Sequence, residues 1–189
     1  FHTMNSKREN KKRFKTTDVV YIGIFAAVIA VCSWIQIPLA VPITLQTFAV
    51  CAAAGLLGLK PRRLTPSVYI LLGLIGVPVF SNFGAGPGVL FGITGGYIVG
   101  FIFTALIVGG AVKQFGRKIG VYVFSMILGV AVCYAFGTAW FMVWSANSGS
   151  PATLGAALMS CVVPFILPDL VKIAAASVIC SKLAKHIRM

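Results

Sequence analysis

Long apolar runs separated by short polar breaks make up most of the chain after its first 16 residues. Crossing the hydrocarbon core of a bilayer takes about 20 apolar helical residues, and each run approaches that length. The pattern predicts an all-α membrane protein with one domain, 17–189, built from six transmembrane helices. The predicted helices cover residues 17–37, 43–59, 64–80, 97–112, 120–144 and a last stretch from Pro168 onwards.

The final apolar stretch, 152–185, is too long for a single span, because a helix of that length extends about 50 Å at 1.5 Å per residue. Pro164 and Pro168 lie inside it, and an interior proline breaks or kinks a helix. A separate span over 152–167 would make seven helices and would put the basic C-terminal residues outside the cell. We therefore expect 152–167 to form a re-entrant or interfacial segment, with the last helix starting near Pro168.

The charges favour this topology. Hydrophobic residues make up 59% of the chain and charged residues 10%, whereas soluble proteins average about 25% charged residues. All Lys and Arg except Lys172 fall in four clusters, at 7–15, 60–63, 113–118 and 182–188, and the net charge is +13. Basic clusters between long uncharged runs follow the positive-inside rule. They predict cytoplasmic N- and C-termini, a multi-pass protein of the bacterial cell membrane, and no nucleic-acid partner.

Signals for catalytic or cofactor chemistry are sparse. Residues 1–16 are expected to be a cloning remnant before Met4, followed by a basic cytoplasmic segment. The five cysteines have no metal-binding spacing, and no Ser/His/Asp set or His pair lies within the spans. The glycine-rich segment 84–88 lacks the lysine of a phosphate-binding loop. We expect no enzyme activity, no cofactor and no nucleotide or metal site in this chain.

Asp169 and Lys172 are the exception to the uncharged spans. Residues three apart share one helix face, so the carboxylate and the ammonium can lie side by side near the start of the last helix. On an insertion scale each charge costs about 2.5–3.5 kcal/mol at the centre of a membrane helix. A charged pair at this place indicates a ligand or ion site, with a purely structural ion pair as the alternative.

Three loops opposite the basic clusters, 38–42, 81–96 and 147–167, contain no Lys or Arg. Non-helical backbone at the membrane is tolerated where it is buried in protein or lines a cavity. We therefore expect these external loops to fold onto the helices and to cap an outward-facing pocket. The candidates for its lining, which lie near the external helix ends, are Gln46, Asn82, Phe83 and Tyr97.

The first predicted helix carries two small-residue repeats, Ala26-x-x-x-Ala30 and Gly23-x-x-x-Ala27. Small residues at this spacing let a second helix approach closely. That second helix can belong to another subunit or to this chain, and the sequence leaves both possibilities open.

Three ordered segments resemble those of a known family: Pro-Ile-Thr-Leu-Gln-Thr-Phe at 42–48, Gly-Ile-Thr-Gly-Gly-Tyr at 92–97 and Pro-Asp-Leu-Val-Lys at 168–172. They are similar to segments of BioY, the biotin-specific substrate-binding (S) component of energy-coupling-factor (ECF) transporters. The resemblance extends over 17–185 and implies a six-helix fold that captures biotin outside the cell. It also implies partners, a transmembrane coupling subunit (EcfT) and two cytosolic ATPase subunits, and Ala26 and Ala30 match the family's docking motif. Ile93 departs from the proline that is usual in the second segment.

The resemblance also suggests roles around biotin, whose ureido ring offers two N–H donors and one carbonyl beside an apolar thiophane ring and a carboxylate. Asp169 would accept from the ureido N–H groups, and Lys172 or Asn82 would donate to the carbonyl or to the carboxylate. The aromatic residues expected to cover the rings are Phe83, Tyr97 and Trp34. An S component for another vitamin is the nearest alternative, because a scaffold does not fix its ligand. A self-sufficient ion-coupled transporter that uses the charged pair is the second alternative.

Overall fold

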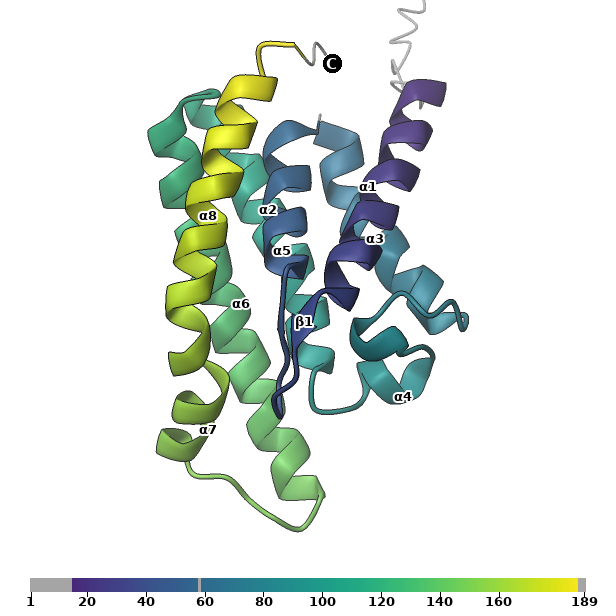
Figure 1. Cartoon of the computed structure of the whole chain (residues 1–189), viewed down its shortest axis with the longest axis vertical. Coiled ribbons are helices and arrows are strands. Elements are labelled where there is room, and N and C mark those ends of the chain that lie inside the picture. The colour runs from purple at the N-terminus through teal and green to yellow at the C-terminus, as the bar shows by residue number, and fades with distance from the viewer. Residues whose placement is uncertain (1–14, 58, 187–189) are drawn as a thin grey trace, which may run out of the picture.

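The computed structural model describes residues 15–57 and 59–186, and most of the predicted N-terminal segment, 1–16, lies outside them. These residues form a bundle of helices with one short hairpin (Figure 1). The helices are α1 (Thr16–Trp34), α2 (Gln46–Leu56), α3 (Leu59–Leu74), α4 (Pro87–Leu90), α5 (Gly95–Phe115), α6 (Ile119–Asn147), α7 (Leu154–Cys161) and α8 (Val163–Leu183). Strands β1 (Gln36–Ile37) and β2 (Ile43–Thr44) pair antiparallel, and a 3-10 turn covers Ser81–Phe83.

Four stretches of the described chain are long and apolar enough to cross a membrane: α1, α5, α6 and the combined stretch Leu154–Leu183. Helix α2 is apolar but has only 11 residues, about 16 Å at 1.5 Å per residue, and most of them are buried. The chain is therefore a mostly helical, membrane-type protein, as predicted. The predicted second helix is shorter than a full span.

The first three helices differ from their predicted ranges. Helix α1 ends at Trp34 instead of residue 37, because the residues that follow pair in the hairpin. Helix α2 starts at Gln46 instead of residue 43, where Thr44 Oγ1 accepts a hydrogen bond from the Gln46 backbone N–H. Helix α3 starts at Leu59 instead of residue 64, so the basic segment 60–63 opens a helix and does not form a loop. Pro61 fits there, because the first turn of a helix leaves its N–H groups unpaired in any case.

Arg62 shows why this basic segment belongs to a helix. Its side chain is 5% exposed, and its guanidinium donates a hydrogen bond to the backbone carbonyl of Gly109 in α5. The glycine makes room for it, since a Cβ at Gly109 would lie 2.2 Å from Arg62 Cδ. At its other end α3 stops at Leu74, ahead of Gly76 with φ +104°, whereas the sequence predicted residue 80.

The last apolar stretch is broken, as predicted, but at a different proline. Helix α7 ends at Cys161, the backbone bends at Val162 (φ −123°, ψ −56°), and α8 begins at Val163. Pro164 occupies the first turn of α8, the place expected for Pro168, which lies inside the helix. Pro168 removes the hydrogen bond that a backbone N–H at this position would give to the carbonyl of Pro164, in the first turn of the helix.

Helices α5 and α6 agree with the predicted ranges to within three residues at each end, and glycines hold them close together. A Cβ at Gly100 would lie 2.7 Å from Cys133 Sγ. Thr104 Oγ1 donates a hydrogen bond of 2.9 Å to the carbonyl of Gly129. In lipid, where no hydrophobic gain drives helices together, close packing at small residues is a main source of association.

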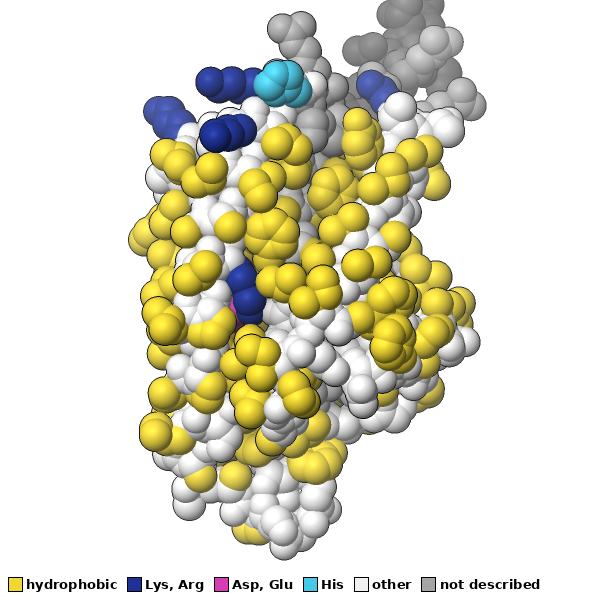
Figure 2. All heavy atoms as spheres, in the orientation of Figure 1, with side chains coloured by type: hydrophobic (Ala, Val, Ile, Leu, Met, Phe, Trp, Pro, Cys, Tyr) yellow, Lys and Arg dark blue, Asp and Glu magenta, His cyan; other side chains and the backbone are white. Residues whose placement is uncertain are grey.

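The surface has the distribution of a membrane protein. On the face drawn in Figure 2, hydrophobic side chains cover the flanks and basic side chains gather at one end. That end holds the start of α1 and the end of α8 (Figure 1). Large apolar side chains are exposed on each of the longer helices, with Phe124 at 71% and Leu167 at 74%. Apolar surface of this extent marks an interaction site, and the lipid tails of a bilayer match it.

Replacing Gly100 by leucine is expected to destabilise the protein, because the new side chain has to push α6 away from α5. Overpacking a tight contact costs about 1–3 kcal/mol. Gly110 on the same helix has no atom within 4 Å of an added Cβ, so Gly110→Leu is the matched control and should unfold like the unsubstituted protein. Thermal unfolding in detergent measures both. Equal unfolding temperatures for the two variants would show that this contact does not stabilise the bundle.

Candidate functional site

A cavity lies in the middle of the bundle, between the hairpin, the start of α2, and helices α5, α6 and α8. Its empty space is about 570 Å³, open solvent at the mouth included. Apolar side chains from the hairpin loop and from α5, α6 and α8 form most of its wall. They include Val41, Ile98, Phe101, Val130 and Phe165.

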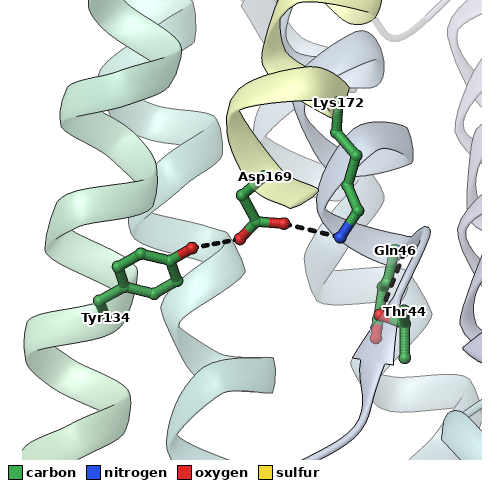
Figure 3. Close-up of polar contacts among 5 residues, drawn as sticks. All are labelled: Thr44, Gln46, Tyr134, Asp169 and Lys172. Atoms are coloured by element: carbon green, nitrogen blue, oxygen red, sulfur yellow. Dashed lines mark hydrogen bonds and ion pairs between the residues drawn. The ribbon is translucent and has the colours of Figure 1, made fainter. Parts of the chain in front are cut away.

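Asp169 and Lys172 are the charged groups of this wall. They lie three residues apart on α8, and Lys172 Nζ is 2.7 Å from Asp169 Oδ1. The Tyr134 hydroxyl, from α6, donates to the other carboxylate oxygen, Oδ2, at 2.5 Å (Figure 3). Asp169 is 3% exposed and Lys172 is 8% exposed. The predicted pair therefore forms, and it faces a cavity.

The hydrogen bonds of this pair leave capacity for a ligand. An ionised carboxylate has about four lone-pair sites and an ammonium has three N–H donors. Within the described chain, each oxygen of Asp169 receives one donor and Lys172 gives one hydrogen bond. Two N–H groups of Lys172 and further lone pairs of Asp169 are thus available to a polar molecule. The two buried charges are tolerated because they pair with each other, whereas an unpaired buried charge would cost several kcal/mol.

Gln46 and Tyr97, both predicted, also line the cavity. Gln46 is the first residue of α2, and its Nε2 donates a hydrogen bond of 2.7 Å to the hydroxyl of Tyr69 in α3. Tyr97 packs its ring against Gly137, where an added Cβ would lie 2.3 Å from the ring. Its hydroxyl is 3.3 Å from Thr138 Oγ1. Both side chains are held by partners behind the cavity wall.

Three predicted residues lie outside the lining. Trp34 and Phe83 stack on each other with ring centroids 5.0 Å apart, and they are 37% and 63% exposed. Asn82 and Phe83 both have positive φ, 57° and 55°, and this turn directs both side chains to the exposed surface. Their neighbour Ser81 lines the cavity instead. The turn thus contributes one polar residue to the cavity that sequence reasoning did not select.

The small-residue repeats of α1 face in different directions. Ala26 and Ala30, predicted to dock a coupling subunit, are 2% and 5% exposed and pack in a cluster with residues of α2, α3 and α5. Their burial favours packing inside this chain, the alternative that the sequence left open. Gly23 and Ala27 are exposed, and an added Cβ at Gly23 would meet no atom within 4 Å.

Tyr134 is the main site residue that sequence reasoning missed. Its partner Asp169 is 35 residues away, so no local spacing joins them. One signal was present: Tyr134 lies about 15 residues into α6, far from the helix ends where membrane tyrosines are enriched. A tyrosine at that depth needs a hydrogen-bond partner inside the protein.

Comparison with known proteins identifies a family. A profile of the BioY family matches residues 5–189. The chain is 38% identical over 168 residues to the biotin transporter BioY of Thermotoga maritima, and the match covers 88% of this chain and 95% of that protein. It is 34% identical over 170 residues to the probable biotin transporter BioY of Pyrococcus horikoshii, and this match covers 89% of the chain and 97% of the relative.

The fold agrees with the sequence matches. The structure superposes on the crystal structure of an S component for biotin from an ECF-type ABC transporter with a TM-score of 0.80. The two chains are 27% identical, and the match covers 92% of this chain and 95% of the other. With four stretches long enough to cross a bilayer, the protein is a multi-pass integral protein of the cell membrane, as predicted. Profile, relatives and fold all lead to one conclusion, that this chain belongs to the BioY family.

Proposed function

We propose that this protein captures biotin at the outer face of the cell membrane, as the substrate-binding S component of an ATP-driven ECF-type vitamin transporter. The observation that carries the proposal is the buried pair of Asp169 and Lys172 at a largely apolar cavity. The identity of the ligand is supported by relatives named as biotin transporters and by the similar biotin S component.

The polar groups of the cavity complement those of biotin. The ureido ring presents two N–H donors and one carbonyl acceptor, so its site needs acceptors and a donor close together. Asp169 supplies carboxylate lone pairs and Lys172 supplies N–H groups, with their nearest atoms 2.7 Å apart. Hydrogen bonds to charged groups are roughly twice as strong as neutral ones. The thiophane ring and the acyl chain then pack on apolar walls such as Phe101 and Phe165.

The hairpin contributes to the enclosure that a tightly bound small molecule needs. Nanomolar affinity corresponds to about 12 kcal/mol, which a ligand of biotin's size reaches only when most of its surface is buried. Val41 and Pro42, in the loop between β1 and β2, line the cavity. Val41 also packs with Cys161 and Phe165 in a small buried cluster, so this loop caps the cavity from the side of α7 and α8.

The topology that we propose has six crossings, α1, α2, α3, α5, α6 and α8, with both termini in the cytoplasm. Basic residues lie at the start of α1, α3 and α6 and at the end of α5 and α8, and the positive-inside rule assigns that end of the bundle to the cytoplasm. Helix α2 is too short to cross alone, but the hairpin continues its path, and its buried position keeps its ends out of lipid. The cavity, at the start of α2, then opens to the outside.

The partners that we propose are a transmembrane coupling subunit and two cytosolic ATPases, because the resemblance is to an S component that acts with them. The exposed repeat Gly23-x-x-x-Ala27 on α1 is the better docking candidate, since its residues are accessible. Close approach of a partner helix needs small side chains at this spacing.

Cysteines introduced at Ser148 and Lys118 test the topology. Both residues are exposed, beyond opposite ends of α6. In intact cells a membrane-impermeant thiol reagent is expected to label the Ser148→Cys variant, and to label Lys118→Cys only after the cells are opened. The natural cysteines are buried or partly buried, and the unsubstituted protein gives the background. Labelling of both variants from the same side would contradict the six-crossing arrangement.

Substitutions of the charged pair test the ligand site. Asp169→Asn keeps the shape of the side chain but removes its charge, and Lys172→Met removes the donors. Losing a charged hydrogen bond in a desolvated site costs about 1.5–3 kcal/mol, so each variant should bind biotin at least about tenfold more weakly. Calorimetric titration of purified, detergent-solubilised protein measures the affinity.

The double variant with Asp169→Asn and Lys172→Met separates a binding role from a structural one. Removing one partner leaves an uncompensated buried charge, which is destabilising, whereas removing both relieves that penalty. The double variant should therefore recover thermal stability without recovering biotin affinity. Normal affinity in any of these variants would remove the pair from the binding site.

Bulky substitutions on α1 test the docking surface. Gly23→Leu or Ala27→Leu should abolish biotin uptake by cells that contain the complete transporter, because the larger side chain keeps a partner helix away. The biotin affinity of the purified variants should stay unchanged, since neither residue lines the cavity. Gly110→Leu, which also enlarges an exposed glycine, should support normal uptake. Normal uptake in the α1 variants would exclude this surface as the docking site.

A further inference from the structure

We propose that Tyr69 is a positioning residue of the cavity, which fixes the Gln46 amide with its carbonyl oxygen toward the ligand. The proposal rests on the proposed function, because it concerns a ligand bound in this cavity. Tyr69 is 1% exposed and lies in α3 behind the cavity wall, so it acts through Gln46 and not by touching the ligand.

The direction of the hydrogen bonds follows from counting protons. The Tyr69 hydroxyl oxygen lies 2.9 Å from the backbone carbonyl oxygen of Val79. A carbonyl can only accept, so the single hydroxyl proton of Tyr69 is used in this contact. The same hydroxyl oxygen lies 2.7 Å from the side-chain amide of Gln46. In this second contact Tyr69 has to accept, and Gln46 therefore turns its NH₂ group, the donor end of the amide, toward Tyr69.

The cavity then receives the acceptor end of the amide. Gln46 is 5% exposed and lines the cavity, and its backbone N–H is bonded to Thr44 Oγ1 at 3.3 Å, which fixes the start of its side chain. Within the described chain the hydrogen bonds of Gln46 use its backbone N–H and its Nε2. Its Oε1 is not fully enclosed by protein, unlike the unpaired Oε1 of Gln36. Oε1 of Gln46 is thus the part of the amide that meets the cavity.

This orientation bears on ligand selection. Gln46, Asp169 and Lys172 line the same cavity, and Figure 3 shows Gln46 beside the hairpin that carries Thr44. The cavity therefore presents two acceptors, Asp169 and Gln46 Oε1, and the donor Lys172. That set matches a cyclic urea, with two N–H groups and one carbonyl. An amide free to rotate would also present NH₂, which cannot accept a hydrogen bond from a ligand N–H.

Tyr69→Phe tests the proposal by removing a single oxygen atom. Val79 keeps a hydrogen bond from Ser33 Oγ at 2.7 Å, so the fold retains a donor for that carbonyl. Biotin is titrated calorimetrically into purified protein, and the dissociation constant of Tyr69→Phe is expected to rise roughly tenfold, the effect of one buried hydrogen bond. The matched control is Tyr122→Phe, since Tyr122 is 0% exposed and bonds the Gly55 carbonyl in a core cluster outside the cavity lining. Its affinity should equal that of the unsubstituted protein.

A double-mutant cycle distinguishes positioning from core packing. In a Gln46→Leu background, Tyr69→Phe should cause no further loss of affinity, because the amide through which it acts is gone. Equal losses in both backgrounds, an unchanged affinity in Tyr69→Phe, or an unchanged affinity in Gln46→Leu alone would each overturn the proposal. No biotin binding by the unsubstituted protein would overturn the proposed function and this inference together, whereas normal binding with no effect of Tyr69→Phe overturns this inference alone.

Discussion

Asp169 and Lys172 can stay charged inside an apolar bundle because each neutralises the other at 2.7 Å. Two separate charges at this depth would each cost several kcal/mol. The neighbouring helices supply further polar groups around the pair. Helix α6 brings the Tyr134 hydroxyl to the second carboxylate oxygen. The short helix α2 starts at the cavity, so that its first residue, Gln46, lines it. The lining of the cavity and the packing of the bundle are therefore coupled through one ion pair.

The non-helical segments between the helices contribute to the same cavity as this pair. Residues from the hairpin loop, from the 3-10 turn and from the segment before α5 all line the cavity: Val41, Pro42, Ser81 and Thr94. Backbone that is not helical exposes polar N–H and C=O groups, which lipid cannot satisfy. Such backbone is stable here because it faces the cavity or is covered by small clusters such as that of Val41 and Phe165. The polar backbone of the loops and the charged pair thus share the same cavity.

Much of this was predictable from the sequence, and the errors have physical causes. Hydropathy predicted α5 and α6 within three residues, and spacing predicted the pair of Asp169 and Lys172. Hydropathy cannot predict that α2 is short, because a buried helix and a membrane-spanning helix have similar composition. It cannot predict the contact of Tyr134 either, because its hydrogen-bond partner, Asp169, lies on another helix.

Orientation was the other source of error. Asn82 and Phe83 are next to a lining residue but face outward because both adopt positive φ, a conformation that the sequence does not predict for phenylalanine. On α1 two repeats with the same spacing are offset by three residues along the helix, at 23 and 27 and at 26 and 30. Only tertiary packing decides which repeat is buried, and here it buries Ala26 and Ala30.

The state of Asp169 also bears on how uptake is driven. An ion-coupled transporter needs a carboxylate that binds and releases a mobile cation on each cycle. Asp169 already pairs with a cation tethered to the same helix, and its second oxygen accepts a hydrogen bond from Tyr134. A mobile cation that took the place of the Lys172 ammonium would leave that charge buried without a partner, at a cost of several kcal/mol. An ion pair that stays in place can still accept and donate hydrogen bonds to a neutral polar ring, which is what the proposed capture of biotin requires.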